Sequence, residues 1–242
     1  MPILETREIS VRFGGHMAVN SVDLAVHAGE ITGLIGPNGA GKTTTFNVIT
    51  GLQAPTRGQV LLDGDDITKV SAHQRARGGI ARTFQRLELF GSLTVRDNVL
   101  TAAELRAKAG HDPQLFTDQL LARVGLTDVA NQRADSLSTG SARLVELARA
   151  LACEPRVLLL DEPASGLDET ETDRFAEILV DLTGDGLAIL LVEHDVPLVM
   201  RLCAQITVLN FGEVLASGSS SEIQKNPEVI DAYLGQDPGA PG

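Results

Sequence analysis

The sequence Gly36-Pro37-Asn38-Gly39-Ala40-Gly41-Lys42-Thr43 decides the fold of this 242-residue chain. It fits the phosphate-binding pattern G-x-x-x-x-G-K-[ST] at every fixed position. The apolar segment 31–35 before it predicts a buried strand, and the segment 44–51 after it predicts a helix that a glycine closes. A strand, a glycine-rich loop and a helix in this order form the context in which this pattern binds phosphate. The alternative, a chance glycine-rich turn, does not account for both flanking elements.

The chemistry of this loop follows from its backbone. Glycines let the chain turn so that successive N–H groups point inward at an anion, and the helix N-terminus adds partial positive charge. We expect Lys42 to reach the β- and γ-phosphates and the Thr43 hydroxyl to ligate Mg²⁺. The residues expected to bind the nucleotide here are Asn38, Gly39, Ala40, Gly41, Lys42, Thr43 and Thr44.

Composition limits the remaining possibilities. With 43% hydrophobic residues the chain can bury the core of one large α/β domain or two small ones. No apolar run approaches the length of a membrane span and the N-terminus lacks a signal-peptide pattern, so we expect a soluble, non-secreted chain with buried, reduced Cys153 and Cys203. The formal net charge of −12 argues against a nucleic-acid partner and against docking on anionic lipid. Any attachment to a membrane would then go through a protein partner.

Two further apolar runs end in polar side chains. The run 157–160 leads into Asp161 and Glu162, and it predicts a central parallel strand buried on both faces. Ligands of such sheets bind at the carboxyl ends of strands, so we expect Asp161 to hold Mg²⁺, directly or through water, and Glu162 to polarise an attacking water. Two acids that only cap a strand are the alternative. The run 186–192 similarly ends near His194, which is then placed to touch a γ-phosphate.

Other segments carry weaker signals. The segment 80–84 predicts a strand that ends at Gln85. Phe13, ahead of the phosphate loop, is either an aromatic residue that stacks on a purine base or a core residue. Residues 94–125 predict helices. Thr94 is the expected N-cap of the first, and Asp97 three residues later resembles the second member of a capping box, with Asp in place of Glu. The apolar side of the second helix is expected to contain Leu115, Leu120, Leu121 and Val124. A further strong helix is predicted over 142–153, after Leu137-Ser138-Thr139-Gly140-Ser141, so the block looks like a helical insertion into an α/β domain.

In this order the motifs resemble those of the nucleotide-binding subunit of an ATP-binding cassette (ABC) transporter, over essentially the whole chain. The signature sequence of that family lies at 137–141, its second acidic motif at 157–162, its dimer-contact turn at 165–168 and its switch histidine at His194. The resemblance implies an α/β P-loop NTPase fold of the ABC-ATPase type, with a mostly parallel core sheet and an N-terminal antiparallel β subdomain. It also implies one domain over 1–242, with a helical subdomain inserted at about 91–150 and a flexible tail at 236–242.

The resemblance further implies how the site works. Two such domains, identical or related, would sandwich ATP head to tail, so that Ser138 and Gly140 of one complete the site of the other. Thr43, Gln85 and Asp161 would arrange Mg²⁺. Glu162 would act as general base or water-orienting group and His194 would hold the γ-phosphate, while Lys42 neutralises the phosphates in a phosphoryl transfer dominated by electrostatics. Gln85 and the loop to Phe90 would pass the motion to membrane-spanning partners.

The signature departs from the usual Leu-Ser-Gly-Gly-Gln of the family at Thr139 and Ser141. This puts the ribose contacts of the missing glutamine in doubt, and it is compatible with two unequal ATP sites in a dimer. Segments 82–85, 192–195 and 226–235 look most like the LivG-type subunit of branched-chain amino-acid importers. That likeness implies two permease subunits, indirectly a substrate-binding protein, and a peripheral position on the cytoplasmic side of the cell membrane.

Several alternatives stay open at this point. Relatives of this kind also serve urea and other amides, and a subunit for lipid or for export is possible within transporters. A soluble ABC-family ATPase of translation or DNA repair is less favoured, because the chain lacks a second cassette, a coiled-coil insertion and basic segments. A regulatory nucleotide-binding module without turnover is disfavoured by Glu162 and His194.

Overall fold

The computed structural model describes residues 1–106 and 112–234. Its strands are β1 (Leu4–Phe13), β2 (His16–Val26), β3 (Ile31–Ile35), β4 (Arg57–Leu62), β5 (Asp65–Asp66), β6 (Ile80–Arg82), β7 (Val157–Asp161), β8 (Ala188–Val192), β9 (Gln205–Asn210) and β10 (Glu213–Gly218). Its helices are α1 (Lys42–Thr50), α2 (Ala72–Arg77), α3 (Val95–Arg106), α4 (Pro113–Arg123), α5 (Thr139–Leu151), α6 (Glu169–Gly184), α7 (Val196–Leu202), α8 (Ser220–Ile223) and α9 (Pro227–Val229), followed by a π-helical turn (Ile230–Leu234). Short 3₁₀ turns cover Thr127–Val129 and Ala134–Ser136.

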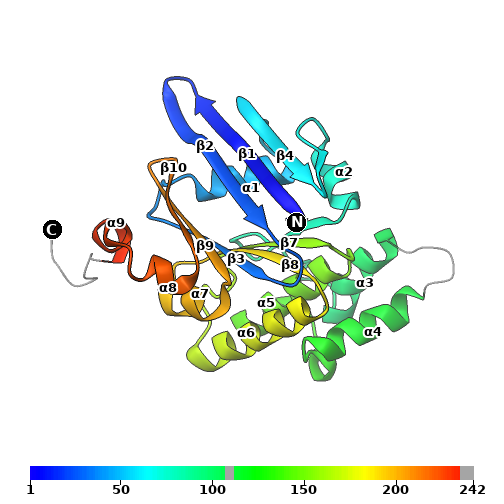
Figure 1. The fold of residues 1–242 in the computed structure, drawn as a ribbon. Helices are drawn as coiled ribbons and strands as arrows, with labels where there is room; N and C mark the ends of the chain where they lie inside the picture. Colours follow the sequence, from blue (N-terminus) through cyan, green and yellow to red (C-terminus); the bar gives the residue numbers. More distant parts are fainter. Residues whose placement is uncertain (107–111, 235–242) are drawn as a thin grey trace.

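The strands form two sheets that lie one above the other in Figure 1. The smaller sheet has the order β2-β1-β4-β5 and is antiparallel. The larger has the order β10-β9-β3-β8-β7-β6, in which only the edge pair β10–β9 is antiparallel. A mostly parallel core sheet beside an N-terminal antiparallel sheet confirms the predicted fold class.

The larger sheet is buried on both faces, which explains its continuous apolar strands. Side chains alternate between two cores because successive residues of a strand point to opposite faces. On β7, Leu158 and Leu160 pack with the helices below the sheet, whereas Val157 and Leu159 pack toward the antiparallel sheet and α1. The carboxyl ends of β3, β7 and β8 are thereby held at one edge of a rigid layer, directly before the loops that carry the candidate residues.

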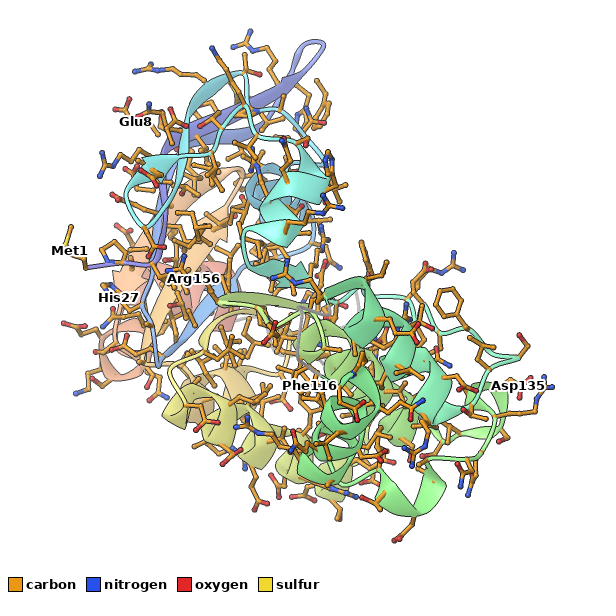
Figure 2. All side chains as sticks on the ribbon, turned by 90° about the vertical axis from the view of Figure 1, so that its right-hand side faces the viewer. Met1, Glu8, His27, Phe116, Asp135 and Arg156 are labelled. Carbon is orange, nitrogen blue, oxygen red and sulfur yellow. The ribbon has the colours of Figure 1, made fainter. Side chains whose placement is uncertain are left out.

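Helices α3, α4 and α5 follow one another between β6 and β7 and form the lower lobe of Figure 2, with Asp135 at its far end and Glu8 of β1 at the opposite end of the molecule. The predicted cap is confirmed, because the N–H of Asp97 donates to the Thr94 hydroxyl over 3.0 Å. The prediction for Leu115 was wrong: this side chain is 57% exposed, while the other predicted apolar residues of that helix are buried.

Some boundaries differ from the prediction for identifiable reasons. Helix α1 begins at Lys42, because Gly41 in a left-handed conformation already serves as its N-cap. Helix α5 begins at Thr139, because the Ser138 hydroxyl accepts the N–H of Ser141 and caps it. Strand β6 ends at Arg82, since the carbonyls of Phe84 and Gln85 accept hydrogen bonds from Arg143 of α5 instead of extending the sheet.

Three other expectations have different outcomes: one is confirmed only in part, one concerns membrane spans, and one is not tested. Cys203 is buried as predicted, whereas Cys153 is only half-buried. Within residues 1–106 and 112–234, no helix is both long and apolar enough to cross a membrane. The tail at 236–242, predicted to be flexible, lies outside the residues that the structure describes.

Candidate functional site

The loop between β3 and α1 depends on glycines where other residues do not fit. A Cβ added to Gly36 would lie 2.1 Å from the Leu209 carbonyl oxygen, and one added to Gly41 would lie 2.7 Å from that of Ala18. Gly39 has open space around it but a φ of +81°, which other residues rarely adopt. The loop is therefore wedged between β2 and the end of β9, and its path is fixed by its surroundings.

The first turn of α1 leaves backbone donors open. Gly41, the N-cap, provides no side-chain cap, so the N–H groups of the first helical turn have no partner within the helix. The ammonium group of Lys42 donates to the carbonyls of Gly36 (2.6 Å) and Pro37 (3.0 Å), which leaves one of its three donors. Burial lowers the pKa of Lys42, and the nearby carboxylates of Glu162 and Asp161 oppose that shift. This geometry suits an anion held by amides and an ammonium group.

Asp161, at the end of β7, is 5% exposed. Its Oδ2 accepts a hydrogen bond of 2.7 Å from Arg82 of β6, and the two side chains form a buried ion pair. Thr43, whose hydroxyl was predicted to share a metal with Asp161, is exposed in the first turn of α1. No role was predicted for Arg82, although a charged residue in the short strand before Gln85 was an available signal.

Glu162 follows Asp161 and brings three predicted residues together. Its Oε2 accepts a hydrogen bond of 2.8 Å from Gln85, and its Oε1 lies 2.6 Å from Nε2 of His194. The backbone of Glu162 is left-handed with a φ of +51°, and its N–H donates to the Val192 carbonyl at the end of β8. Such a conformation is unusual for a residue with a side chain and is typical of functional sites.

Glu193 is a further residue that sequence reasoning missed. It lies between the end of β8 and His194, is 4% exposed, and accepts the N–H groups of Ala164 (2.7 Å) and His194 (3.1 Å). Burial raises the pKa of Glu193, while these two hydrogen bonds partly offset the shift. The side chain thereby ties the loop after Glu162 to the loop that carries His194. A carboxylate next to an apolar strand was the available signal.

Ser138 and Gly140 lie elsewhere. They begin α5, and among the described residues no hydrogen bond joins them to the phosphate loop. Gly140 is buried against α6, where an added Cβ would lie 2.3 Å from Oε1 of Glu171. A role of these residues in the site of a second copy stays a prediction.

Phe13 ends β1 beside a two-residue turn and is 50% exposed. The interpretation of Phe13 as a core residue was therefore wrong, and its stacking on a purine base stays a prediction. The predicted nucleotide-binding residues Asn38, Gly39, Ala40 and Thr44 are in the loop and the first turn of α1 as expected.

The residues present fit a magnesium ion that is shared with a nucleotide. Within the described residues, no group of three or more His, Cys, Asp or Glu side chains is placed to hold a metal alone. Mg²⁺ usually takes one or two carboxylates together with substrate phosphates and water, and it prefers oxygen donors. The Thr43 hydroxyl, Asp161 and the Gln85 side chain provide such donors next to the phosphate loop.

Comparison with known proteins identifies relatives over nearly the whole chain. A family model described as ABC transporter matches residues 19–165, and one described as branched-chain amino acid ATP-binding cassette transporter matches residues 213–238. The chain is 41% identical to the high-affinity branched-chain amino acid transport ATP-binding proteins BraF of Pseudomonas aeruginosa and LivG of Escherichia coli, each over 97% of this chain and 98% of that protein. It is 37% identical to the lipopolysaccharide export system ATP-binding protein LptB of Acidithiobacillus ferridurans, over 96% of this chain and 97% of that protein.

Solved structures agree. A nucleotide-free ATP-binding cassette from an ABC transporter superposes with a TM-score of 0.87 at 29% identity, covering 98% of this chain and 100% of that one. A dimeric cassette in a post-hydrolysis state, bound to ADP and phosphate, superposes with a TM-score of 0.80 at 27% identity, covering 90% and 98%. Cassette dimers therefore occur among the relatives. The chain belongs to the ABC transporter family, as an ATP-binding and ATP-hydrolysing subunit.

Proposed function

We propose that this subunit powers the uptake of branched-chain or related amino acids through membrane-spanning partners, from a peripheral position on the cytoplasmic side of the membrane. The observation that supports this cargo most directly is the match of residues 213–238 to the branched-chain amino acid cassette model. The likeness to BraF and LivG over 97% of the chain supports the same cargo. No residue of this subunit is assigned a contact with the amino acid.

In the proposed reaction, the open amides of the α1 N-terminus and Lys42 hold the phosphates of ATP. Glu162 orients the attacking water or accepts its proton, which is a task for a carboxylate within hydrogen-bond reach of that water. His194 then holds the γ-phosphate, and Phe13 stacks on the base. Mg²⁺, held by Thr43, Gln85 and Asp161, would neutralise charge on the β- and γ-phosphates.

The complete site is proposed to need two cassettes. Ser138 and Gly140 lie away from the phosphate loop of their own chain, so they would contact the γ-phosphate bound by a partner cassette. The helix N-terminus at α5 can present donors to that phosphate. ATP would hold the two cassettes together, and hydrolysis would release them. The partner is a second copy or a related subunit.

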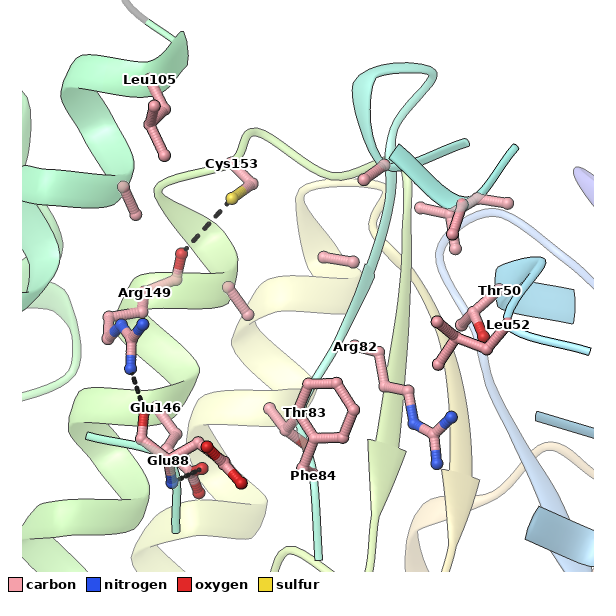
Figure 3. A pocket seen from close by; sticks show the side chains of 16 residues that line it. Thr50, Leu52, Arg82, Thr83, Phe84, Glu88, Leu105, Glu146, Arg149 and Cys153 are labelled. Carbon is pink, nitrogen blue, oxygen red and sulfur yellow. Dashed lines mark hydrogen bonds between the residues drawn. The ribbon is translucent and has the colours of Figure 1, made fainter. Parts of the chain in front are cut away.

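A groove between the two lobes is the proposed contact for the permease. Its volume is about 400 Å³, and Figure 3 shows it between the strand that carries Arg82 and the helix that carries Arg149, with Cys153 just after the end of that helix. Exposed apolar side chains line it, among them Leu52, Phe84 and Leu105. Because the chain carries a net charge of −12, an anionic lipid surface is a poor partner for this groove, and an apolar protein helix is a good one.

The first experiment is a pull-down of the chain from detergent-solubilised native membranes, with the co-purifying proteins identified. Two polytopic membrane proteins, a second cassette and a binding protein would support the proposal, and leucine uptake by the purified complex in proteoliposomes would test the cargo. Recovery of soluble partners alone would overturn it. Because LptB is 37% identical to the chain, a lipid-export complex is the second candidate. It predicts the same kind of recovery but no leucine uptake.

The groove has its own test, which uses Cys153. This half-buried thiol lines the groove, and burial raises its pKa. Cys203 is only 6% exposed, and burial raises its pKa to about 12. Maleimide labelling should therefore occur at Cys153, should vanish in the Cys153→Ser variant, and should slow when the permease is added. A labelling rate that the permease leaves unchanged would contradict docking at this groove.

A further inference from the structure

Arg82 is a buried cation that touches the candidate magnesium ligand. Its side chain is 8% exposed, and Nη2 donates to Oδ2 of Asp161 over 2.7 Å. Nη1 donates to Oδ1 of Asn47, in α1, over 2.6 Å. The guanidinium group thus joins the end of β7 to the helix that follows the phosphate loop.

Two aromatic rings hold this guanidinium group in place. It lies 5.4 Å from the ring centre of Phe46 and 5.2 Å from that of Phe84. Figure 3 shows Arg82 and Phe84 side by side at the groove. Contacts of this kind stabilise a cation most when water is excluded. The side chain is therefore fixed by two hydrogen bonds and two rings.

The ion pair changes what Asp161 can offer to a metal. A lone buried carboxylate needs a cation, but here Arg82 already provides one, and Lys42 adds a second positive charge close by. A free divalent ion would have to approach these charges with few protein ligands, because the described residues contain no cluster of three or more side chains able to hold a metal. An ion that is already bound to phosphates has several of its ligands in place, and the ion–phosphate complex has less positive charge than the free ion.

We propose that Arg82 is a positioning residue for Asp161, which keeps the cation site weak until nucleotide arrives. In the nucleotide-free cassette it neutralises and orients the carboxylate, so that Mg²⁺ enters with ATP and not before it. This inference rests on the proposed role of Asp161 toward Mg²⁺. It adds an order of binding, and it gives a role to Arg82, for which the sequence predicted none.

The test measures binding of Mn²⁺, a paramagnetic substitute for Mg²⁺, to the complete chain without nucleotide by electron paramagnetic resonance. The wild type should bind weakly. Arg82→Met should bind one Mn²⁺ at least tenfold more tightly. In this variant the buried carboxylate of Asp161 has lost its ion-pair partner, so binding a cation stabilises it. Arg82→Lys should stay near the wild type, and the double variant Arg82→Met with Asp161→Asn should lose the gain. Mg²⁺ alone should raise the melting temperature of Arg82→Met more than that of the wild type.

Each outcome is decisive. A folded Arg82→Met protein that binds Mn²⁺ as weakly as the wild type overturns the inference and leaves the role of Asp161 intact. If Arg82→Met does not fold, Arg82→Gln keeps a hydrogen-bond donor without the charge, and the same tenfold gain is expected of it. The proposed role of Asp161 is tested separately, because Asp161→Asn should shift the Mg²⁺ dependence of ATP hydrolysis to higher concentration; an unchanged dependence would overturn that role.

Discussion

Nε2 of His194 lies 2.6 Å from Oε1 of Glu162, at the point where β7 and β8 end side by side. Gln85 occupies the other oxygen of the same carboxylate. Both oxygens of the proposed general base are thus engaged by side chains that also have proposed roles toward ATP. Each of these oxygens has a second lone pair, through which Glu162 can accept a hydrogen bond from an attacking water while both contacts persist.

Glu162→Gln should leave ATP binding within about threefold of the wild type and lower hydrolysis by about 10²–10⁴-fold, because the amide cannot accept a proton. Phosphate release measures the rate and calorimetry measures binding. Glu177→Gln, at an exposed carboxylate of α6, is the matched control and should behave as the wild type. Hydrolysis at the wild-type rate in Glu162→Gln would refute the assignment of the base.

Lys42→Ala should weaken ATP binding itself. The lost ammonium group makes charge-assisted hydrogen bonds, for which about 2 kcal/mol, or about thirtyfold in affinity, is expected. The two loop carbonyls that Lys42 now satisfies would also lose their donor, so the loop should become less ordered. Calorimetric titration with ATP checks the affinity, and an unchanged value would contradict the proposed phosphate contact.

Much of the architecture could be predicted from local patterns. The runs before Gly36, Glu162 and His194 gave the parallel strands because strands buried on both faces are continuously apolar. The wrong boundaries have two causes. The starts of α1 and α5 are set by local caps at Gly41 and Ser138, whereas the end of β6 is set by a contact from a distant segment. Strand β6 is shortened by Arg143, which lies 59 residues away from Phe84 in the sequence.

The candidate site was predictable only where a motif marks it. Gln85, Glu162 and His194 were named from three separate segments, and the structure brings them together. Arg82 and Glu193 were missed although each is a charged residue in or next to an apolar strand, because that pattern does not show what the side chain touches. A buried charge is recognisable only when its burial is known.

Glu193 should make stability depend on pH. Because burial raises its pKa above the ordinary value of 4.5, the folded protein binds this proton more tightly than the unfolded chain. The resulting stabilisation is complete below pH 4.5 and is lost as the pH rises through the folded pKa. Glu193→Gln does not titrate, so the free energy of unfolding of the wild type should fall relative to that of Glu193→Gln over this window. Urea unfolding at several pH values measures this, and a difference that does not change with pH would contradict it.

The two halves of the proposed site should complement each other between chains. Ser138→Ala removes an N-cap worth about 1 kcal/mol, and Asp112→Ala, at the N-cap of α4, is its control because it removes a cap without touching the site. Only Ser138→Ala should lower ATP hydrolysis.

Lys42→Ala and Ser138→Ala should each be impaired alone, yet an equimolar mixture should regain activity, because a mixed head-to-tail dimer contains one site with an intact Lys42 and an intact Ser138. Steady-state hydrolysis by the mixture, compared with each variant at the same total concentration, measures the gain. A mixture no more active than the mean of its components would contradict the contribution of Ser138 to the site of a second copy.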